Sequence, residues 1–169
     1  MEHPWFSEGQ PPVILGVGRL EKQKDFPNLI RAFAKVRKVR EARLVILGWG
    51  NEMSELENLT RVLDVHEDVA FLGAVRNPYA YMARSAVFAL SSLYEGLPTV
   101  LIEAMAMGVP VVSTDCPHGP AEILNGGEYG ELLPCEQSDL LAEAIVRILD
   151  GEKNLFQHPG LINLQQKLI

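Results

Sequence analysis

Residues 87–113 read VFALSSLYEGLPTVLIEAMAMGVPVVS, and this stretch contains the structural unit on which the fold prediction rests. Two short apolar runs, 87–90 and 109–113, are typical of buried strands. They flank a segment from about 98 to 107 that is predicted to be a helix. Pro110 predicts that the second strand is either an edge strand or one that begins close to the proline. A strand, a helix and another strand in this order indicate a βαβ unit with parallel strands.

The same alternation extends along the chain in both directions. Asp25, shortly before Pro27, is expected to cap the first helix, whose apolar spacing runs to Val39. Six strands that alternate with helices predict an α/β fold, a doubly wound parallel sheet of the Rossmann-like type with three layers, α/β/α. Further strands are predicted at 13–17, 44–47, 69–72 and 131–133, and further helices at 26–39, 52–63, 78–83, 121–124 and 138–149.

Length and composition indicate one domain with an ample core. The chain has 169 residues, of which 47% are hydrophobic, and we assign residues 1–151 to the domain. Residues 152–169 lack a clear strand pattern and are expected to form a docking helix or a frayed tail. A net charge of -7 argues against nucleic acid as a partner. The two cysteines, Cys116 and Cys135, lack metal-ligand spacing and are interpreted as reduced thiols. No secretory signal and no membrane span is recognised, which predicts a cytoplasmic protein.

The polar features of the sequence follow predicted strands. In an open parallel sheet the ligand lies beyond the carboxyl ends of the strands. Arg19 and Lys24 follow the first strand and could hold a diphosphate beside a helix N-terminus, although they could equally be solvated loop charges. Glu95 and Glu103 lie eight positions apart, and Glu103 falls within an apolar helix. A carboxylate in such a helix requires either a hydrogen-bond partner or a polar ligand.

Three common nucleotide-binding signatures are missing from the sequence. No Gly-x-Gly-x-x-Gly follows a glycine-bearing strand, which argues against a nicotinamide fingerprint. No Gly-x4-Gly-Lys-Ser/Thr occurs, so the chain is not a P-loop protein. No Asp-x-Asp occurs that would suggest a metal-bridged diphosphate. A receiver domain would need clustered acidic residues after its first strand, where this chain is basic.

The Glu-x7-Glu spacing, with Gly96 after the first glutamate and Ala-Met-Ala after the second, resembles the donor-site motif of retaining GT-B glycosyltransferases of family 4, the group 1 glycosyltransferases. Gly-Arg-Leu followed by Lys24 and Asp-Phe-x-x-Leu-Ile-x-Ala-Phe resembles the diphosphate loop of the same family. The resemblance covers about residues 12–149. It implies the C-terminal, donor-binding half of a two-domain GT-B enzyme.

The resemblance also implies roles for individual residues. Arg19 and Lys24 would bind the phosphates of a nucleotide-sugar and Glu103 the ribose hydroxyls, while Glu95 would face the donor sugar. Arg19, Lys24 and Glu95 are therefore the predicted catalytic residues. Amides at a helix N-terminus would help to hold the phosphates. The residues around that helix start are Gly96, Leu97, Pro98, Thr99 and Val100.

Three further segments are weaker matches. The loop with Gly73, Ala74 and Val75 resembles the one whose backbone contacts the base, although its apolar residues are equally consistent with an ordinary strand end. Trp49 stands where the family commonly has an acidic residue between two glycines, and the flanking glycines still allow close approach. His118 lies in a loop that resembles one near the donor pocket, where it would touch phosphate or sugar or have no role.

The implied activity is transfer of a glycosyl group, with retention, from a UDP- or GDP-linked sugar to a hydroxyl acceptor in polysaccharide or glycolipid synthesis. No metal and no other cofactor is expected, because the basic pair would replace the metal. The acceptor half, an N-terminal GT-B domain, is expected to lie outside this chain and to carry any association with the inner face of the membrane, so the fragment alone is expected to be inactive. The alternatives are a nucleotide-sugar epimerase of GT-B type and a non-catalytic nucleotide-binding module.

Overall fold

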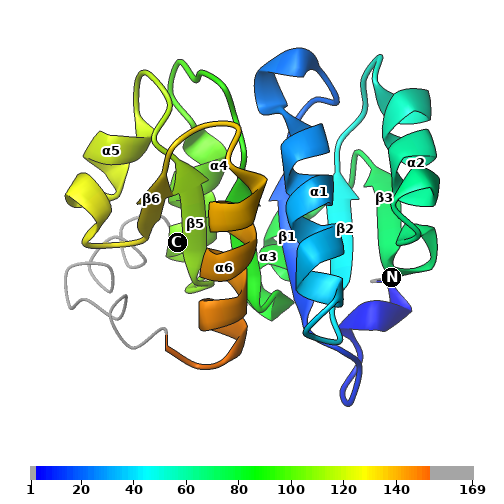
Figure 1. The fold of residues 1–169 in the computed structure, drawn as a ribbon. Helices are drawn as coiled ribbons and strands as arrows, with labels where there is room; N and C mark the ends of the chain where they lie inside the picture. Colours follow the sequence, from blue (N-terminus) through cyan, green and yellow to red (C-terminus); the bar gives the residue numbers. More distant parts are fainter. Residues whose placement is uncertain (1–2, 153–169) are drawn as a thin grey trace.

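The computed structural model describes residues 3–152, which form a six-stranded parallel sheet between two layers of helices (Figure 1). The strand order is β3-β2-β1-β4-β5-β6, and every adjacent pair is parallel. This arrangement confirms the predicted doubly wound sheet. The strands are β1 (Val13–Val17), β2 (Arg43–Leu47), β3 (Val69–Gly73), β4 (Val87–Leu90), β5 (Val111–Thr114) and β6 (Glu131–Leu133).

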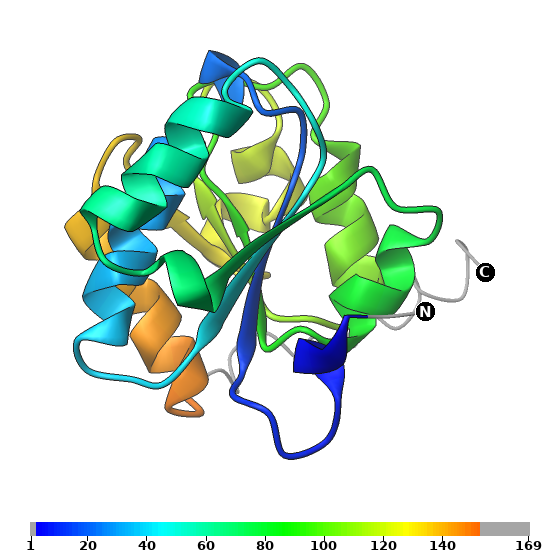
Figure 2. The same ribbon diagram turned by 90° about the vertical axis from the view of Figure 1, so that its right-hand side faces the viewer.

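The helices divide between the two faces of the sheet, as the view in Figure 2 shows. On one face lie α1 (Phe26–Arg37), α2 (Met53–Val62) and α6 (Ser138–Leu149). On the other lie α3 (Pro78–Arg84), α4 (Thr99–Ala106) and α5 (Pro120–Ile123). Within residues 3–152 there are also four short 3-10 helices that the sequence pattern did not predict. One precedes β1, η1 (Pro4–Phe6), and three lie in connections: η2 (Lys22–Lys24), η3 (His66–Asp68) and η4 (Asn125–Gly127).

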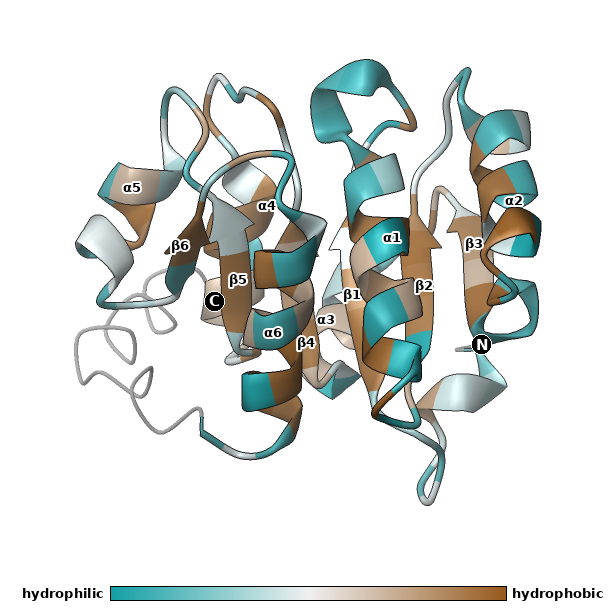
Figure 3. Cartoon of the chain, viewed as in Figure 1, coloured by the Kyte–Doolittle hydropathy of each residue, from teal (hydrophilic) through white to brown (hydrophobic). Residues whose placement is uncertain are grey.

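The central strands are buried on both faces, and each strand sends alternate residues to opposite cores. In β1, Ile14 packs against α1 and α6, whereas Val13 and Leu15 pack against the core beneath α3 and α4. Such strands read as continuous apolar runs because both faces are covered. Figure 3 shows the result, with apolar strands enclosed by helices whose outer surfaces are hydrophilic.

Two details of the sequence prediction need correction. Helix α1 begins as expected, with the Asp25 carboxylate accepting from the backbone N–H of Asn28 at 3.4 Å, but it ends at Arg37. Val39, which the apolar spacing assigned to the buried face, is 69% exposed because the helix has ended before it. Strand β5 begins at Val111 rather than 109, so Pro110 lies just outside a strand that is internal to the sheet.

The strand order reverses between β1 and β4, and this position determines where a ligand can sit. From β1 the chain builds outward through β2 and β3, and from β4 it builds in the opposite direction through β5 and β6. The loops after β1 and β4 therefore leave the sheet side by side, at the edge that lies uppermost in Figure 1. A crevice at such a reversal is the usual ligand site of an open α/β sheet.

The predicted tail, residues 152–169, falls outside the described residues except for Glu152. Within residues 3–152, no helix combines the length and apolar character that crossing a membrane requires.

Candidate functional site

The central feature of the candidate site is an ion pair between the loops that follow β1 and β4. The Lys24 ammonium lies 2.5 Å from Oε1 of Glu95. The Lys24 side chain is 16% exposed and that of Glu95 only 6%, so both charges are largely removed from water. Two residues 71 positions apart in the chain are thus brought together, a contact that the sequence did not predict.

Ser92 holds the Glu95 carboxylate in this position. Its hydroxyl donates to the same oxygen, Oε1, at 2.5 Å, and Ser92 is fully buried. The backbone N–H of Glu95 donates to the carbonyl of Pro117 at 3.2 Å. Lys24 therefore compensates the charge of the buried carboxylate and Ser92 fixes its orientation, as a buried charge requires.

Further hydrogen bonds tie the two loops together. The Ser91 hydroxyl donates to the carbonyl of Lys24 at 2.7 Å. The backbone N–H of Leu93 donates to the carbonyl of Gln23 at 2.8 Å, and the Gln23 side-chain amide donates to the carbonyl of Tyr94 at 3.1 Å. Sequence reasoning missed the roles of Ser91 and Ser92. Two consecutive serines directly after a buried strand were the signal that could have identified them.

Residues of β5 and of the segment after β6 support the loop after β4. The Thr114 hydroxyl donates to the carbonyl of Ser92 at 2.6 Å, and the Cys135 thiol lies 3.7 Å from the same carbonyl. Cys116 and Cys135 are both free, and burial raises the pKa of each thiol above its ordinary value. At neutral pH both thiols are therefore protonated.

Arg19 lies on the same loop as Lys24 but in a different environment. Its side chain is 65% exposed, and the guanidinium pairs with Glu21 at 2.8 Å. The guanidinium also lies over the Trp49 ring, 5.6 Å from the ring centre. Trp49 is itself 62% exposed. The residue that departs from the family pattern therefore forms a cation–π contact with Arg19, which is predicted to bind phosphate.

The glycines on either side of Trp49 permit a close backbone approach, as the sequence suggested. A Cβ on Gly48 would lie 1.9 Å from the carbonyl oxygen of Gly18, and one on Gly50 would lie 2.5 Å from that of Leu20. The backbone N–H of Leu20 donates to the carbonyl of Trp49 at 3.0 Å. The loop after β2 therefore holds the loop after β1 from the side opposite to the serines.

Glu103 lies on α4, the helix that follows the Glu95 loop. It is half-buried, and within residues 3–152 its carboxylate forms no hydrogen bond or ion pair. At the start of this helix, Leu97 and Thr99 are exposed, and the N–H of Thr99 donates to the carbonyl of Leu97 at 2.8 Å. Pro98, the N-cap residue, has no N–H to offer a phosphate.

The remaining predicted loops lie at the same edge of the sheet. The carbonyl of Gly73 accepts from the N–H of Gly48 at 2.8 Å, which places the predicted base loop beside the Trp49 loop. Ala74 is exposed and Val75 is half-buried. His118 is exposed with a φ of 65°, in a loop that packs against Pro98 through Gly119.

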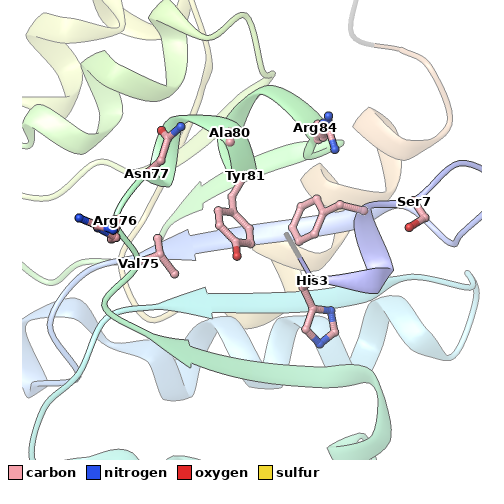
Figure 4. Close-up of a pocket in the computed structure, with 9 residues that line it drawn as sticks. His3, Ser7, Val75, Arg76, Asn77, Ala80, Tyr81 and Arg84 are labelled. Atoms are coloured by element: carbon pink, nitrogen blue, oxygen red, sulfur yellow. The ribbon is translucent and has the colours of Figure 1, made fainter. Parts of the chain in front are cut away.

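A separate cavity of about 660 Å³ lies beside α3 (Figure 4). Its lining includes Phe6 and Tyr81, whose rings pack edge to face. On its rim, Arg76, Asn77 and Arg84 extend in different directions and do not converge on one point. Its lining includes Val75 of the predicted base loop, but none of its lining residues belongs to the loops after β1 or β4, and we do not include the cavity in the candidate site.

Comparison with known proteins points to one family. A profile of the family described as "Glycosyl transferases group 1" matches residues 3–159. The chain is 39% identical over 140 residues to the N-acetylgalactosamine-N,N'-diacetylbacillosaminyl-diphospho-undecaprenol 4-alpha-N-acetylgalactosaminyltransferase of Campylobacter jejuni. That alignment covers 83% of this chain and 38% of the relative.

Solved structures agree with this comparison. The apo form of the lipopolysaccharide outer core galactosyltransferase WaaB superposes with a TM-score of 0.80 at 29% identity, over 95% of this chain and 46% of that one. Anabaena Alr3699/HepE, solved in complex with UDP and glucose, superposes with a TM-score of 0.77 at 26% identity, over 94% of this chain and 47% of that one. The chain thus spans less than half the length of each of these three proteins.

The packing of the two glycine-bearing loops predicts that Gly48→Ala destabilises the protein. Gly48 has a φ of 133°, and a methyl group there would overlap the backbone of Gly18, which has no flexible end that could move aside. We expect the free energy of unfolding to fall by about 1–3 kcal/mol, the usual range for backbone strain. Urea unfolding of the two proteins measures the change.

Gly96→Ala is the matched control, because no atom lies within 4 Å of the added Cβ and the backbone of Gly96 is not in the left-handed region. Its unfolding midpoint should stay close to that of the wild type. An equal effect of the two substitutions would show that the loop contact does not constrain residue 48.

Proposed function

Because the chain belongs to the group 1 glycosyl transferases, we propose that residues 12–149 form the donor-binding half of an enzyme that transfers a sugar from a nucleotide-sugar to a hydroxyl acceptor. The observation that carries the proposal is the meeting of Lys24 and Glu95 at the reversal of strand order. A cation and a carboxylate at that edge match two adjacent parts of a nucleotide-sugar, its diphosphate and the hydroxyl-bearing ring of its sugar.

The diphosphate binds to the loop after β1. Lys24 contributes a compact positive charge from a half-buried position, and Arg19 contributes a planar fork of donors from an exposed one. The exposed N-terminal end of α4 adds its partial positive charge on the neighbouring loop. As the bond to the sugar breaks, negative charge grows on the departing diphosphate, and these groups stabilise it.

The two glutamates contact the hydroxyl-bearing parts of the donor. Glu103 lacks a partner among the described residues and accepts from the ribose hydroxyls, a task suited to an acceptor-only carboxylate. Glu95, held by Ser92, faces the donor sugar. The backbone around Gly73, Ala74 and Val75 lies along the same edge and contacts the base.

Binding requires no divalent metal, because Arg19 and Lys24 provide the positive charge that a metal would otherwise supply. HepE, a structural neighbour, was solved with UDP and glucose, which supports a nucleotide-sugar as the ligand here. The name of the Campylobacter relative describes transfer to a sugar linked to diphospho-undecaprenol, which supports a role in glycolipid or polysaccharide synthesis. Transfer proceeds with retention and in a cleft whose other wall is an N-terminal GT-B domain.

The metal-free account predicts that residues 1–169 bind a nucleoside diphosphate in the presence of EDTA. Calorimetry with UDP, GDP and ADP, each with EDTA or with added Mg²⁺, tests this and also identifies the preferred base. We expect similar affinity in both buffers for the preferred nucleotide. Binding that appears only with Mg²⁺ would contradict the assignment of Arg19 and Lys24.

The ribose assignment predicts that Glu103→Gln weakens nucleotide binding selectively. A hydrogen bond to a charged carboxylate contributes roughly 1.5–3 kcal/mol, and this amount should be lost from the binding free energy of the nucleotide. Inorganic diphosphate has no ribose, so its affinity should not fall.

Glu143→Gln is the control, since Glu143 is exposed on α6 and the substitution changes the net charge equally. Equal losses for nucleotide and inorganic diphosphate in Glu103→Gln would show that Glu103 supports the fold instead of contacting ribose.

Because the proposed cleft is formed by two domains, we predict that residues 1–169 bind the donor without transferring its sugar. Holding both reactants in reactive geometry contributes roughly 7–11 kcal/mol to catalysis, and one donor-binding domain holds only one of them. Product analysis with radiolabelled nucleotide-sugars and lipid or saccharide acceptors should detect no transfer until a partner domain is added. Robust transfer by residues 1–169 alone would contradict the proposal.

A further inference from the structure

The Lys24–Glu95 pair has a consequence for which ligands the site retains. Lys24 has one ammonium group, and that group contacts the Glu95 carboxylate at 2.5 Å. A phosphate that binds Lys24 must either displace this carboxylate or share the ammonium with it. Both alternatives place like charges close together in a region where little water screens them.

The surrounding hydrogen bonds prevent the two side chains from separating freely. The Ser92 hydroxyl holds Oε1 of Glu95 at 2.5 Å, on the oxygen that faces Lys24. The Ser91 hydroxyl holds the carbonyl of Lys24 at 2.7 Å, which fixes the start of its side chain. The Glu95 side chain is only 6% exposed, so water cannot readily solvate its charge if the ion pair opens.

We propose that Glu95 is a specificity-determining residue that selectively weakens the binding of a bare diphosphate at Lys24. The inference rests on the proposed function, in which Lys24 binds the diphosphate and Glu95 faces the sugar. An attached sugar donates hydroxyl hydrogens to the carboxylate and so offsets the repulsion, whereas a nucleoside diphosphate without a sugar has no such group. Glu95 therefore favours release of the nucleotide that remains after transfer.

Ser92 is the positioning residue for this effect. It carries no charge, but its hydroxyl keeps the carboxylate next to the ammonium. Without the hydroxyl, the carboxylate gains freedom to turn away when a diphosphate arrives. Loss of the Ser92 hydroxyl should thus raise the affinity for a diphosphate, as loss of the Glu95 charge does, but by a smaller factor.

The test is calorimetry on residues 1–169 and on Glu95→Gln, with inorganic diphosphate and with UDP, GDP and ADP. Glutamine keeps the size of the side chain and an oxygen that can accept from Ser92, but it removes the charge. We expect Glu95→Gln to bind diphosphate groups more tightly, by on the order of tenfold, because a like charge next to the ligand is gone. Ser92→Ala should tighten binding by a smaller factor and also keeps the test decisive if Glu95→Gln does not fold.

Two controls separate this effect from others. Glu143→Gln changes the net charge equally at an exposed position on α6 and should leave affinity unchanged. In a Lys24→Met background, Glu95→Gln should change affinity by a different factor than in the wild type, because the ammonium shared by the carboxylate and the ligand is gone; the same factor in both backgrounds would show that Glu95 acts without Lys24.

The outcomes also separate this inference from the proposed function. Unchanged or weaker binding by both Glu95→Gln and Ser92→Ala, with a wild type that binds nucleotides, would overturn the role of Glu95 alone. A wild type that binds inorganic diphosphate but no nucleotide would overturn the donor assignment, while the variants would still test Glu95 with inorganic diphosphate. A wild type that binds neither would overturn both.

Discussion

The parallel pairing of β1 with β4 is the constraint on which the rest of this site depends. The two strands are neighbours in the sheet, with Ile14 opposite Val87 and Leu15 opposite Phe88, although two further strands separate them in the chain. Because all six strands run in the same direction, the loops that leave these two neighbouring strands emerge side by side at one edge of the sheet. Lys24 and Glu95 contact each other for that reason.

The loop after β1 is held from two sides, which makes it a rigid platform. On one side the Trp49 loop approaches so closely that only glycine fits at Gly48. On the other side Ser91 and Leu93 bond to the backbone of the loop. A platform of this kind loses little conformational entropy when a ligand binds, because its backbone is ordered beforehand. The side chain of Arg19, exposed on this platform, remains able to follow the ligand.

The electrostatic character of the site differs from that of the whole chain. The net charge of -7 opposes the general accumulation of anions around the protein. The site, however, combines one half-buried cation, one exposed cation and a helix N-terminus with one buried carboxylate. In the proposed function, selection of a small anion depends on this local balance, because salt screens distant charges while the buried pair is screened far less. The serine at position 92 matters for the same reason, since it fixes one charge relative to the other.

The order of strands and helices was readable from the sequence alone, because burial on both faces of a parallel sheet produces apolar runs and helix periodicity is local. Arg19, Lys24 and Glu95 were also identifiable as candidates, since each follows a predicted strand, and Glu103 was identifiable as a carboxylate within an apolar helix. Tertiary structure alone decided that Lys24 pairs with Glu95, that Ser92 orients the carboxylate and that Arg19 stacks on Trp49. Each of these contacts joins separate loops or depends on side-chain direction within a loop, and such geometry is set only when the strands assemble side by side.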